Sequence, residues 1–276
     1  MVDHLEVFKD GRTSYESMIA RNNSKVPMAD KQQTYIVLGG TGAIGSAVVR
    51  QLAASGSHVV VGCRDLEKAG PLVEESSCDV HCVEADDPAS IEACVKAAVE
   101  KHGGLTGVVN CIGSVLLKPA HLTSDAEWHH TITTNLTSSF SLLRAATKAM
   151  RKSGGSIVLV SSAAAQIGLS NHEAIAAAKA GIIGLMLSAA ATYSNRGIRV
   201  NAVAPGLVKS EITRKLWETD EAAAVSAQMH AMGRIGEAED VARAIVWLLD
   251  PSNSWVTGQT IGVDGGLGSV LTRMKM

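Results

Sequence analysis

The chain has 276 residues, of which 46% are hydrophobic and 19% charged, and its formal net charge at pH 7 is -2. This composition is typical of a soluble globular protein and too apolar for intrinsic disorder. The near-neutral charge, with no basic block, argues against nucleic acid and anionic membrane surfaces as partners. No apolar run reaches the roughly 18 residues that a transmembrane helix needs, so we expect no membrane span.

The first part of the chain shows no export or targeting pattern. Residues 1–31 mix acids, bases and amides without the apolar segment of a secretory signal, and the acids also argue against a mitochondrial presequence. We expect residues 1–33 to be an N-terminal extension without a fixed fold, and residues 34–276 to form the folded domain. Met28 stands just before the first predicted strand, so residues 1–27 are either an upstream extension or a cloning remnant.

The five cysteines form no Cys-x-x-Cys pair. Cys78 and Cys82 flank His81, but the residues around them alternate as in a strand, and no second ligand pair follows. We interpret these cysteines as ordinary thiols and predict no metal site. Reduced thiols also fit a cytoplasmic protein.

Apolar runs and amphipathic stretches alternate along the chain. In chain order the pattern predicts strands at 34–38, 58–62, 80–84, 107–110, 156–161, 199–203 and 260–263, and helices at 43–54, 66–74, 88–101, 125–151, 171–194 and 239–249. Continuously apolar strands that alternate with helices are typical of a parallel sheet covered on both faces. The sequence therefore predicts a doubly wound α/β fold of the Rossmann type in a single domain.

Residues 206–236 interrupt this alternation. They are more polar than their surroundings and contain Trp217 and Met229. Segments that follow the carboxyl end of a strand overhang the ligand crevice of an open parallel sheet. We interpret them as a small substrate-covering lobe, and the alternative is a connecting helix pair without a function.

The strongest local signal lies at the first predicted strand. The strand Tyr35-Ile-Val-Leu38 runs into Gly39-Gly40-Thr41-Gly42-Ala43-Ile44-Gly45, where the first predicted helix begins. Glycines allow the backbone to approach a pyrophosphate, and the N–H groups at the helix start bind its charge. This strand–turn–helix context predicts a dinucleotide-binding turn.

Several motifs together resemble the short-chain dehydrogenase/reductase family. They are this turn, Asn110-Cys-Ile-Gly113, Val200-Asn-Ala-Val-Ala-Pro-Gly206, Val256-Thr-Gly-Gln259 and Val263-Asp-Gly-Gly266, and the match covers residues 34–268. The turn departs from the family pattern at Leu38, in place of a threonine, and at Ala43, in place of a glycine. We expect the turn to tolerate both changes.

The resemblance implies a set of cofactor-binding residues. It places the pyrophosphate at the glycine-rich turn, the adenine at Asp86, the nicotinamide ribose near Asn110 and Lys179, and the carboxamide after the Pro205-Gly206 turn. The residues implied are Gly39, Thr41, Gly42, Ile44, Gly45, Arg64, Asp86, Asn110, Gly113, Lys179, Pro205, Gly206, Val208 and Ser210.

The end of the second predicted strand indicates which dinucleotide is bound. An NAD enzyme needs a carboxylate there to accept from the ribose 2′-hydroxyl. The resemblance places Cys63 in that position, and a thiol does not serve. Arg64 follows and offers a fork of donors suited to a 2′-phosphate, although it is also a plausible surface arginine at a helix start. We therefore expect NADP(H) in preference to NADH.

The family usually carries an Asn, a Ser and a Tyr, with a Lys four residues after the Tyr. Asn135, Ser162 and Lys179 fit three of these positions, but Ile175 occupies the tyrosine position. The missing hydroxyl is the usual proton donor, and loss of a positioned acid typically costs about 10²–10⁴-fold in rate.

A replacement donor lies nearby. In the enoyl-thioester reductases of the same family the tyrosine stands seven residues before the lysine, and His172 occupies that spacing here. We expect a helix to place His172, Ile175 and Lys179 on one face, with Glu173 beside the imidazole or in solvent. The alternative is a partly exposed polar His172. Tyr193 and His230 are the other conceivable acids.

These residues predict an NADPH-dependent oxidoreductase that reduces the carbonyl group of a small organic substrate. Reduction of an activated C=C bond and non-catalytic NADP(H) binding are the alternatives. The apolar helices at 125–151 and 171–194 exceed what one sheet face covers, and the family pairs such helices between subunits. We therefore expect a homodimer or homotetramer.

Overall fold

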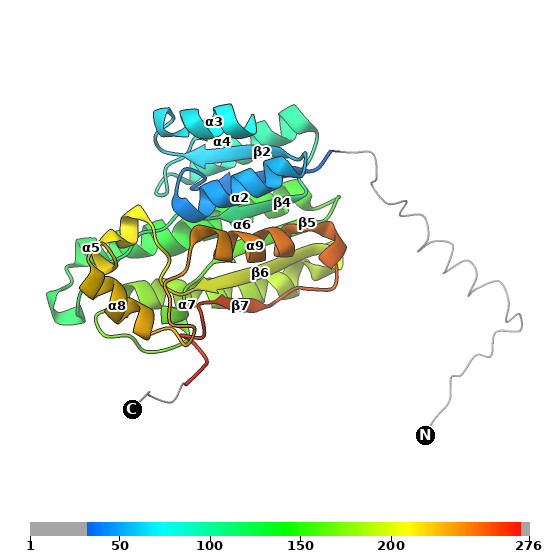
Figure 1. The fold of residues 1–276 in the computed structure, drawn as a ribbon. Helices are drawn as coiled ribbons and strands as arrows, with labels where there is room; N and C mark the ends of the chain where they lie inside the picture. Colours follow the sequence, from blue (N-terminus) through cyan, green and yellow to red (C-terminus); the bar gives the residue numbers. More distant parts are fainter. Residues whose placement is uncertain (1–31, 272–276) are drawn as a thin grey trace, which may run out of the picture. The chain divides into compact units, whose positions relative to one another are not determined.

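A computed structural model describes residues 32–271 of the chain, so the expectation about the N-terminal extension lies almost wholly outside the described residues. Seven parallel strands form one sheet in the order β3-β2-β1-β4-β5-β6-β7 (Figure 1). The strands are β1 (Thr34–Leu38), β2 (His58–Cys63), β3 (Asp79–Cys82), β4 (Gly107–Asn110), β5 (Gly155–Val160), β6 (Ile198–Pro205) and β7 (Thr260–Val263). The predicted doubly wound parallel sheet is confirmed.

Helices connect the strands in the predicted alternation. They are α2 (Ala43–Ala54), α3 (Gly70–Ser76), α4 (Pro88–His102), α5 (Asp125–Ile132), α6 (Ser138–Met150), α7 (Glu173–Tyr193), α8 (Asp220–Gln228) and α9 (Ala238–Leu249). The helix predicted at 125–151 is divided into α5 and α6 by a π-helical turn at Thr133–Thr137. The strand predicted at 80–84 lies one to two residues earlier, because its pairing with β2 ends at Cys82.

The two faces of the sheet bury two separate apolar layers, since successive side chains of a strand point to opposite faces. Ile36 and Val108 belong to the layer covered by α4, α6 and α7, whereas Val37 and Val109 belong to the layer covered by α2 and α9. Figure 1 shows α2 and α9 lying side by side over the sheet. This alternation explains why the strands read as continuous apolar runs.

Helix α7 departs from the expectation that no segment could span a membrane, since it is long and apolar enough by length and composition alone. It packs against β5 and β6, and Ile182 and Met186 are fully buried in the layer beneath it. The apolar character of α7 therefore belongs to a helix that covers the sheet.

The order of the strands decides where a ligand can bind. β1 lies between β2 and β4, so the chain winds outward in opposite directions from the centre of the sheet. After β1 the chain passes to the face covered by α2, and after β4 it passes to the face covered by α6. The carboxyl ends of these two strands form the switch point at which open parallel sheets bind ligands.

Candidate active site

The loop between β1 and α2 is a tight turn whose glycines are required by packing. Gly39 has a φ of 72°, in the left-handed region that glycine adopts without strain. A Cβ at Gly39 would lie 2.8 Å from the main chain of Cys111, and a Cβ at Gly45 would collide with the carbonyl oxygen of Gly39. The turn thus brings the start of α2 and the end of β4 close together.

The start of α2 offers its amides to a ligand. Gly42 is the N-cap residue, no side chain caps the helix, and its first turn carries no acidic residue. Thr41 and Ile44 are partly accessible beside it. Free N–H groups and the positive end of the helix dipole favour a negatively charged group. The turn therefore fits the pyrophosphate of a dinucleotide.

The end of β2 presents an exposed cation, and the carboxylate that follows it is bonded within its own turn. Cys63 is 4% exposed, whereas Arg64 is exposed and takes part in none of the ion pairs of residues 32–271. The nearby Asp65 is already occupied, because its Oδ1 accepts from the amides of Glu67 at 3.1 Å and Lys68 at 3.3 Å. The only side chain of this turn that is both exposed and positively charged is that of Arg64.

Two further cofactor candidates follow β3 and β4. Asp86 lies exposed just after β3, ahead of α4. Asn110 is buried, and its Nδ2 donates to the hydroxyls of Ser138 at 3.0 Å and Ser139 at 2.9 Å. Its Oδ1 accepts from the amide of Ile112 at 3.1 Å. Asn110 thus fixes the loop after β4 onto the start of α6.

Asn135 lies in the π-helical turn between α5 and α6, a feature that often marks functional sites. It is fully buried, and its Nδ2 donates to the carbonyl of Thr131 and to the hydroxyl of Ser114, both at 3.0 Å. Its Oδ1 accepts from the amide of Ser114 at 3.2 Å. Asn135 therefore fixes Ser114, in the loop after β4, to the π-helical turn.

Lys179 reaches the same place from α7. A Cβ built on Gly113 would lie 3.1 Å from Asn135 Oδ1 and 3.6 Å from Lys179 Nζ, so these three residues converge. Nζ donates to the carbonyl of Val160 at 2.9 Å. Burial lowers the pKa of Lys179 to about 8, and burial raises the pKa of the neighbouring Cys111 thiol to about 12. The thiol is therefore neutral at physiological pH, whereas the pKa of Lys179 lies close to physiological pH.

The two serines after β5 have different surroundings. Ser161 is buried, and its Oγ donates to the main-chain carbonyl of Lys179 at 2.8 Å, which ties β5 to α7. Ser162 is half-buried, and its Oγ accepts from the amide of Ala164 at 3.2 Å. The Ser162 hydroxyl can still donate its own proton, whereas that of Ser161 is used within the fold.

The expectation that one helix face carries His172, Ile175 and Lys179 is wrong for the histidine. α7 begins at Glu173, and His172 is its N-cap residue with non-helical backbone angles. Its Nδ1 lies 2.7 Å from the carbonyl oxygen of Ser170, an acceptor, so Nδ1 carries the proton. The preceding loop therefore orients the imidazole. Ile175 and Lys179 are both buried on the helix, and Glu173 is exposed.

Of the other two candidate acids, Tyr193 lies far from Lys179, and both ring nitrogens of His230 are already hydrogen-bonded. Tyr193 ends α7 fourteen residues after Lys179, about 21 Å along a helix. His230 is buried, with Nδ1 2.8 Å from the carbonyl of Ser226 and Nε2 3.1 Å from the amide of Leu207. Nδ1 therefore donates and Nε2 accepts, so both nitrogens of His230 serve the structure of the lobe.

The segment after β6 forms a closed lobe at residues 206–236. Val208 pairs with Gly236 at its base, and the side chain of Val208 is buried. Ser210 begins a 3-10 helix at Glu211–Leu216 and shares a hydrogen bond of 2.9 Å with the Thr213 hydroxyl. The lobe thus begins directly after Pro205, at the carboxyl end of β6, where we expected the residues that bind the carboxamide.

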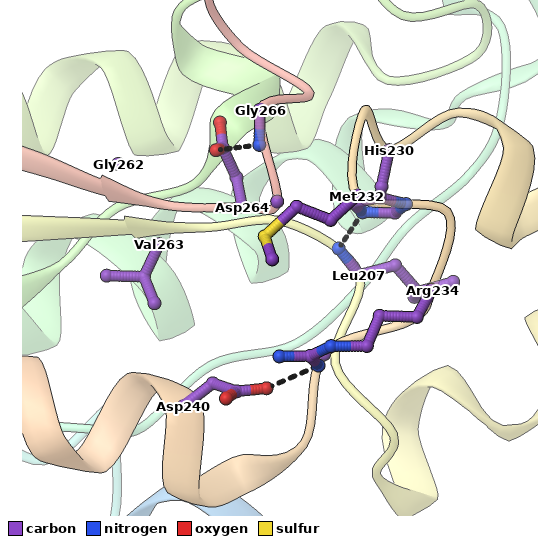
Figure 2. A pocket seen from close by; sticks show the side chains of 11 residues that line it. Leu207, His230, Met232, Arg234, Asp240, Gly262, Val263, Asp264 and Gly266 are labelled. Atoms are coloured by element: carbon purple, nitrogen blue, oxygen red, sulfur yellow. Dashed lines mark hydrogen bonds and ion pairs between the residues drawn. The ribbon is translucent and has the colours of Figure 1, made fainter.

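A cavity of about 360 Å³ lies between this lobe and the end of β7 (Figure 2). Figure 2 shows His230 bonded to the amide of Leu207 and Arg234 paired with Asp240 along its wall, the latter at 2.6 Å. None of Asn135, Ser162, His172 and Lys179 lines it. This cavity is therefore separate from the point where Gly113, Asn135 and Lys179 converge.

Sequence reasoning missed Ser114 and the role of Ser161. Ser114 directly follows Gly113, and only the fold places it opposite Asn135, 21 residues further along the chain. Ser161 and Ser162 are adjacent and identical, so their sequence context carried no signal for their different roles.

Known proteins resemble this chain over nearly its whole folded part. A family model described as enoyl-(acyl carrier protein) reductase matches residues 40–268. The 3beta-hydroxysteroid dehydrogenase 1 of Eggerthella lenta is 35% identical over 245 residues, which cover 86% of this chain and 94% of that protein. The 3-oxoacyl-(acyl-carrier-protein) reductase FabG of Escherichia coli is 34% identical, with 84% and 96% covered.

Solved structures give the same result. A short-chain type dehydrogenase/reductase from Mycobacterium ulcerans superposes with a TM-score of 0.82 at 31% identity, covering 86% of this chain and 90% of that one. ElxO with NADP bound also has a TM-score of 0.82, at 28% identity, with 87% and 100% covered. The fold, the order of the motifs and these relatives agree, and the chain belongs to the short-chain dehydrogenase/reductase family of oxidoreductases.

Proposed function

We propose that this oxidoreductase uses NADPH to reduce the carbonyl group of a small organic substrate, as a cytoplasmic homodimer or homotetramer. The observation that carries the proposal is the convergence of Gly113, Asn135 and Lys179. They meet at the carboxyl edge of the sheet, where the loop after β4 adjoins the glycine-rich turn.

The dinucleotide is assigned from the residues around this point. The uncapped start of α2 binds the pyrophosphate, and Asp86 lies toward the adenine. The Arg64 guanidinium, exposed and outside the ion pairs of residues 32–271, binds the 2′-phosphate. Pro205 ends β6, and together with Gly206, Val208 and Ser210, which follow it, it holds the carboxamide. ElxO, of the same fold, binds NADP, which supports this choice.

Bound NADPH supplies the hydride, and the protein must orient the substrate and supply a proton. Lys179 binds the nicotinamide ribose hydroxyls, while Asn110 and Asn135 keep the loop after β4 in place. Ser162 donates a hydrogen bond to the substrate oxygen, since its hydroxyl proton is not used by Ala164. These residues position the carbonyl and polarise it.

His172 is our candidate for the proton donor. Its Nδ1 is held by the Ser170 carbonyl, so Nε2 is the atom that exchanges a proton with substrate or solvent. An imidazole can carry a proton on either ring nitrogen, so it can act as a general acid. Ile175 is buried and has no proton to donate, and by the family resemblance it occupies the position of the tyrosine.

Ile175 also favours a second candidate function, reduction of an activated C=C bond. An enone needs hydride at its β-carbon and polarisation of its carbonyl oxygen, and water can then supply the proton. The loss of the tyrosine affects that reaction less than carbonyl reduction. The family model that matches residues 40–268 is described as enoyl-(acyl carrier protein) reductase.

One assay separates these functions. Protein is mixed with NADPH and a panel of ketones, 3-oxoacyl thioesters, enones and enoyl thioesters, and the loss of reduced-nicotinamide absorbance is followed. Turnover of ketones or 3-oxoacyl compounds supports the proposal, whereas turnover of only enones or enoyl thioesters supports the second function. NADPH binding without turnover of any substrate class would indicate a non-catalytic NADP(H)-binding protein.

A further inference from the structure

Cys63 and Cys82 are the last residues of two neighbouring strands. They face each other in the parallel pairing of β2 with β3. Paired residues of neighbouring strands project their side chains to the same face of a sheet, and the strands lie about 4.8 Å apart. Val61 and Val80 precede them by two residues on that face. The two thiols therefore lie side by side.

This spacing is close to that of a disulfide. A Cα separation of about 4.8 Å lies within the range of about 4.4–6.8 Å found for bonded cysteines. Side chains of parallel strands leave the sheet in parallel, so the Cβ atoms start slightly beyond the usual 3.5–4.5 Å or so. Because Cys63 and Cys82 both end their strands, a small shift of the strand ends closes this gap. A bond formed across this gap would be strained, and strained disulfides are readily reduced.

The two thiols differ in accessibility. Cys82 is exposed, whereas Cys63 is 4% exposed and its pKa is raised, first by burial and then by Cys82. Cys82 therefore meets an oxidant first, and Cys63 is the resolving thiol. Cys78 lies four residues before Cys82, about 13 Å away along an extended strand, and is buried. It is a poorer partner for Cys82.

Both thiols also hold the turn that carries Arg64. Cys63 Sγ donates to the carbonyl of Asp65 at 3.4 Å, and Cys82 Sγ donates to the carbonyl of Arg64 at 3.7 Å. A disulfide has no S–H group, so its formation removes both hydrogen bonds at once. A bond between these cysteines therefore changes the support of the residue assigned to the 2′-phosphate.

We propose that Cys63 and Cys82 are a modification site, at which a peroxide forms a reversible intramolecular disulfide next to Arg64. The Cys82 thiol ionises, its sulfur attacks one peroxide oxygen, and the O–O bond breaks; a sulfenic acid forms, and the departing hydroxide takes up the proton that the thiol released and becomes one water. The Cys63 thiol then attacks that sulfur, and the sulfenic hydroxyl leaves with the thiol proton as a second water. Two thiols lose two electrons, and hydrogen peroxide becomes two waters.

Mass spectrometry of the full-length protein tests the bond. Reduced protein is treated with hydrogen peroxide, alkylated, and digested without reductant by a protease that cleaves before aspartate. Cleavage at Asp65, Asp79 and Asp86 separates Cys63, Cys78 and Cys82 onto three peptides. We expect the protein to be two hydrogens lighter, with the peptides of Cys63 and Cys82 joined, and glutathione to reverse the change.

Matched variants check the partners. Cys82→Ser and Cys63→Ser should each abolish the joined peptide, whereas Cys78→Ser should leave it unchanged. A Cys82 that is over-oxidised while Cys63 stays alkylated would overturn the proposal. A bond from Cys82 to Cys78 or to another chain would also overturn it, and the wild-type digest detects each of these without any variant.

The effect on Arg64 is measured separately, and this part rests on the proposed NADPH site. Oxidised protein should bind NADPH at least about threefold more weakly than reduced protein, while the Cys82→Ser variant should show no response to peroxide. Equal affinities with the disulfide present would disprove its influence on the Arg64 turn. Reduced protein that binds no NADPH would instead contradict the proposed function, and the mass measurement would still decide the disulfide.

Discussion

Lys179 Nζ donates a hydrogen bond of 2.9 Å to the main-chain carbonyl of Val160, the last residue of β5. This bond anchors a buried ammonium that takes part in none of the ion pairs of residues 32–271. Four residues earlier on the same helix, Ile175 offers neither a proton nor a hydrogen bond. In the proposed reaction, the proton must therefore come from a group other than Ile175.

The buried lysine predicts a dependence of stability on pH. Burial lowers its pKa to about 8, below the ~10.4 of an exposed lysine. Between these values the folded protein binds fewer protons than the unfolded chain, so the free energy of unfolding should rise with pH. Below about pH 8 the cost of burying the ammonium is fully present, about 3 kcal/mol for such a shift. Lys179→Met removes this cost.

Urea unfolding of the cofactor-free wild type and Lys179→Met, between about pH 7 and 9.5, measures the effect. The variant should be more stable near neutral pH, and its advantage should shrink as the pH rises. Comparing the two proteins at each pH cancels the titration of the buried cysteines to first order. An advantage that stays constant with pH would contradict the lowered pKa.

Arg64 should decide the choice of dinucleotide. We expect NADPH to bind at least about tenfold more tightly than NADH, equivalent to roughly 1.4 kcal/mol. Arg64→Ala should remove most of this preference, because Arg64 takes part in none of the ion pairs of residues 32–271, whereas the nearby Lys68 is paired with Asp65. Fluorescence titration of both dinucleotides measures it, with the exposed Arg151→Ala as the control. Equal affinities in the wild type, or an Arg64→Ala variant that keeps the preference, would refute the assignment.

His172 should control the chemical step and leave cofactor binding unchanged. His172→Ala is expected to lower kcat/KM by about 10²-fold or more, the range of a positioned general acid. His129→Ala is a matched control, because His129 is also bonded through Nδ1 to a main-chain carbonyl, that of Asp125, at 2.6 Å.

Ile175→Tyr is the complementary change. It restores a hydroxyl four residues before Lys179 and should create or raise ketone reduction. An active enzyme that does not respond to His172→Ala would exclude the histidine from the mechanism. Catalysis would then depend on Ser162, Lys179 and water, which favours C=C reduction. Absence of turnover in both variants and the wild type would favour the non-catalytic protein.

The exposed apolar face of α6 and α7 should form a two-fold interface. Phe140 is 46% exposed and Leu187 is 51% exposed, although both lie on helices that cover the sheet. We expect a dimer or tetramer at micromolar concentration, measured by light scattering. Leu187→Glu should dissociate it, whereas Leu66→Glu, at a residue equally exposed, should not. A monomeric wild type would contradict this prediction.

The sequence by itself determined the sheet and the glycine-rich turn after β1. Continuous apolar strands such as 107–110 need cover on both faces, and only a parallel sheet with helices on each side provides it. Gly39 and Gly45 were recognisable because a left-handed φ and a close backbone contact exclude any side chain. These requirements are local, so a sequence displays them directly.

Tertiary structure alone decided how the polar residues are used. The helix predicted at 125–151 contains a π turn, and it is this turn, together with the loop after β4, that sets the contacts of Asn135. The loop before α7 moved His172 off the helix face and bonded it to Ser170. The pairing of β2 with β3 brought Cys63 opposite Cys82. The contacts of Asn135 and the pairing of Cys63 with Cys82 join segments distant in the chain, and the cap at His172 depends on the conformation of a loop, so periodicity and spacing carry no information about them.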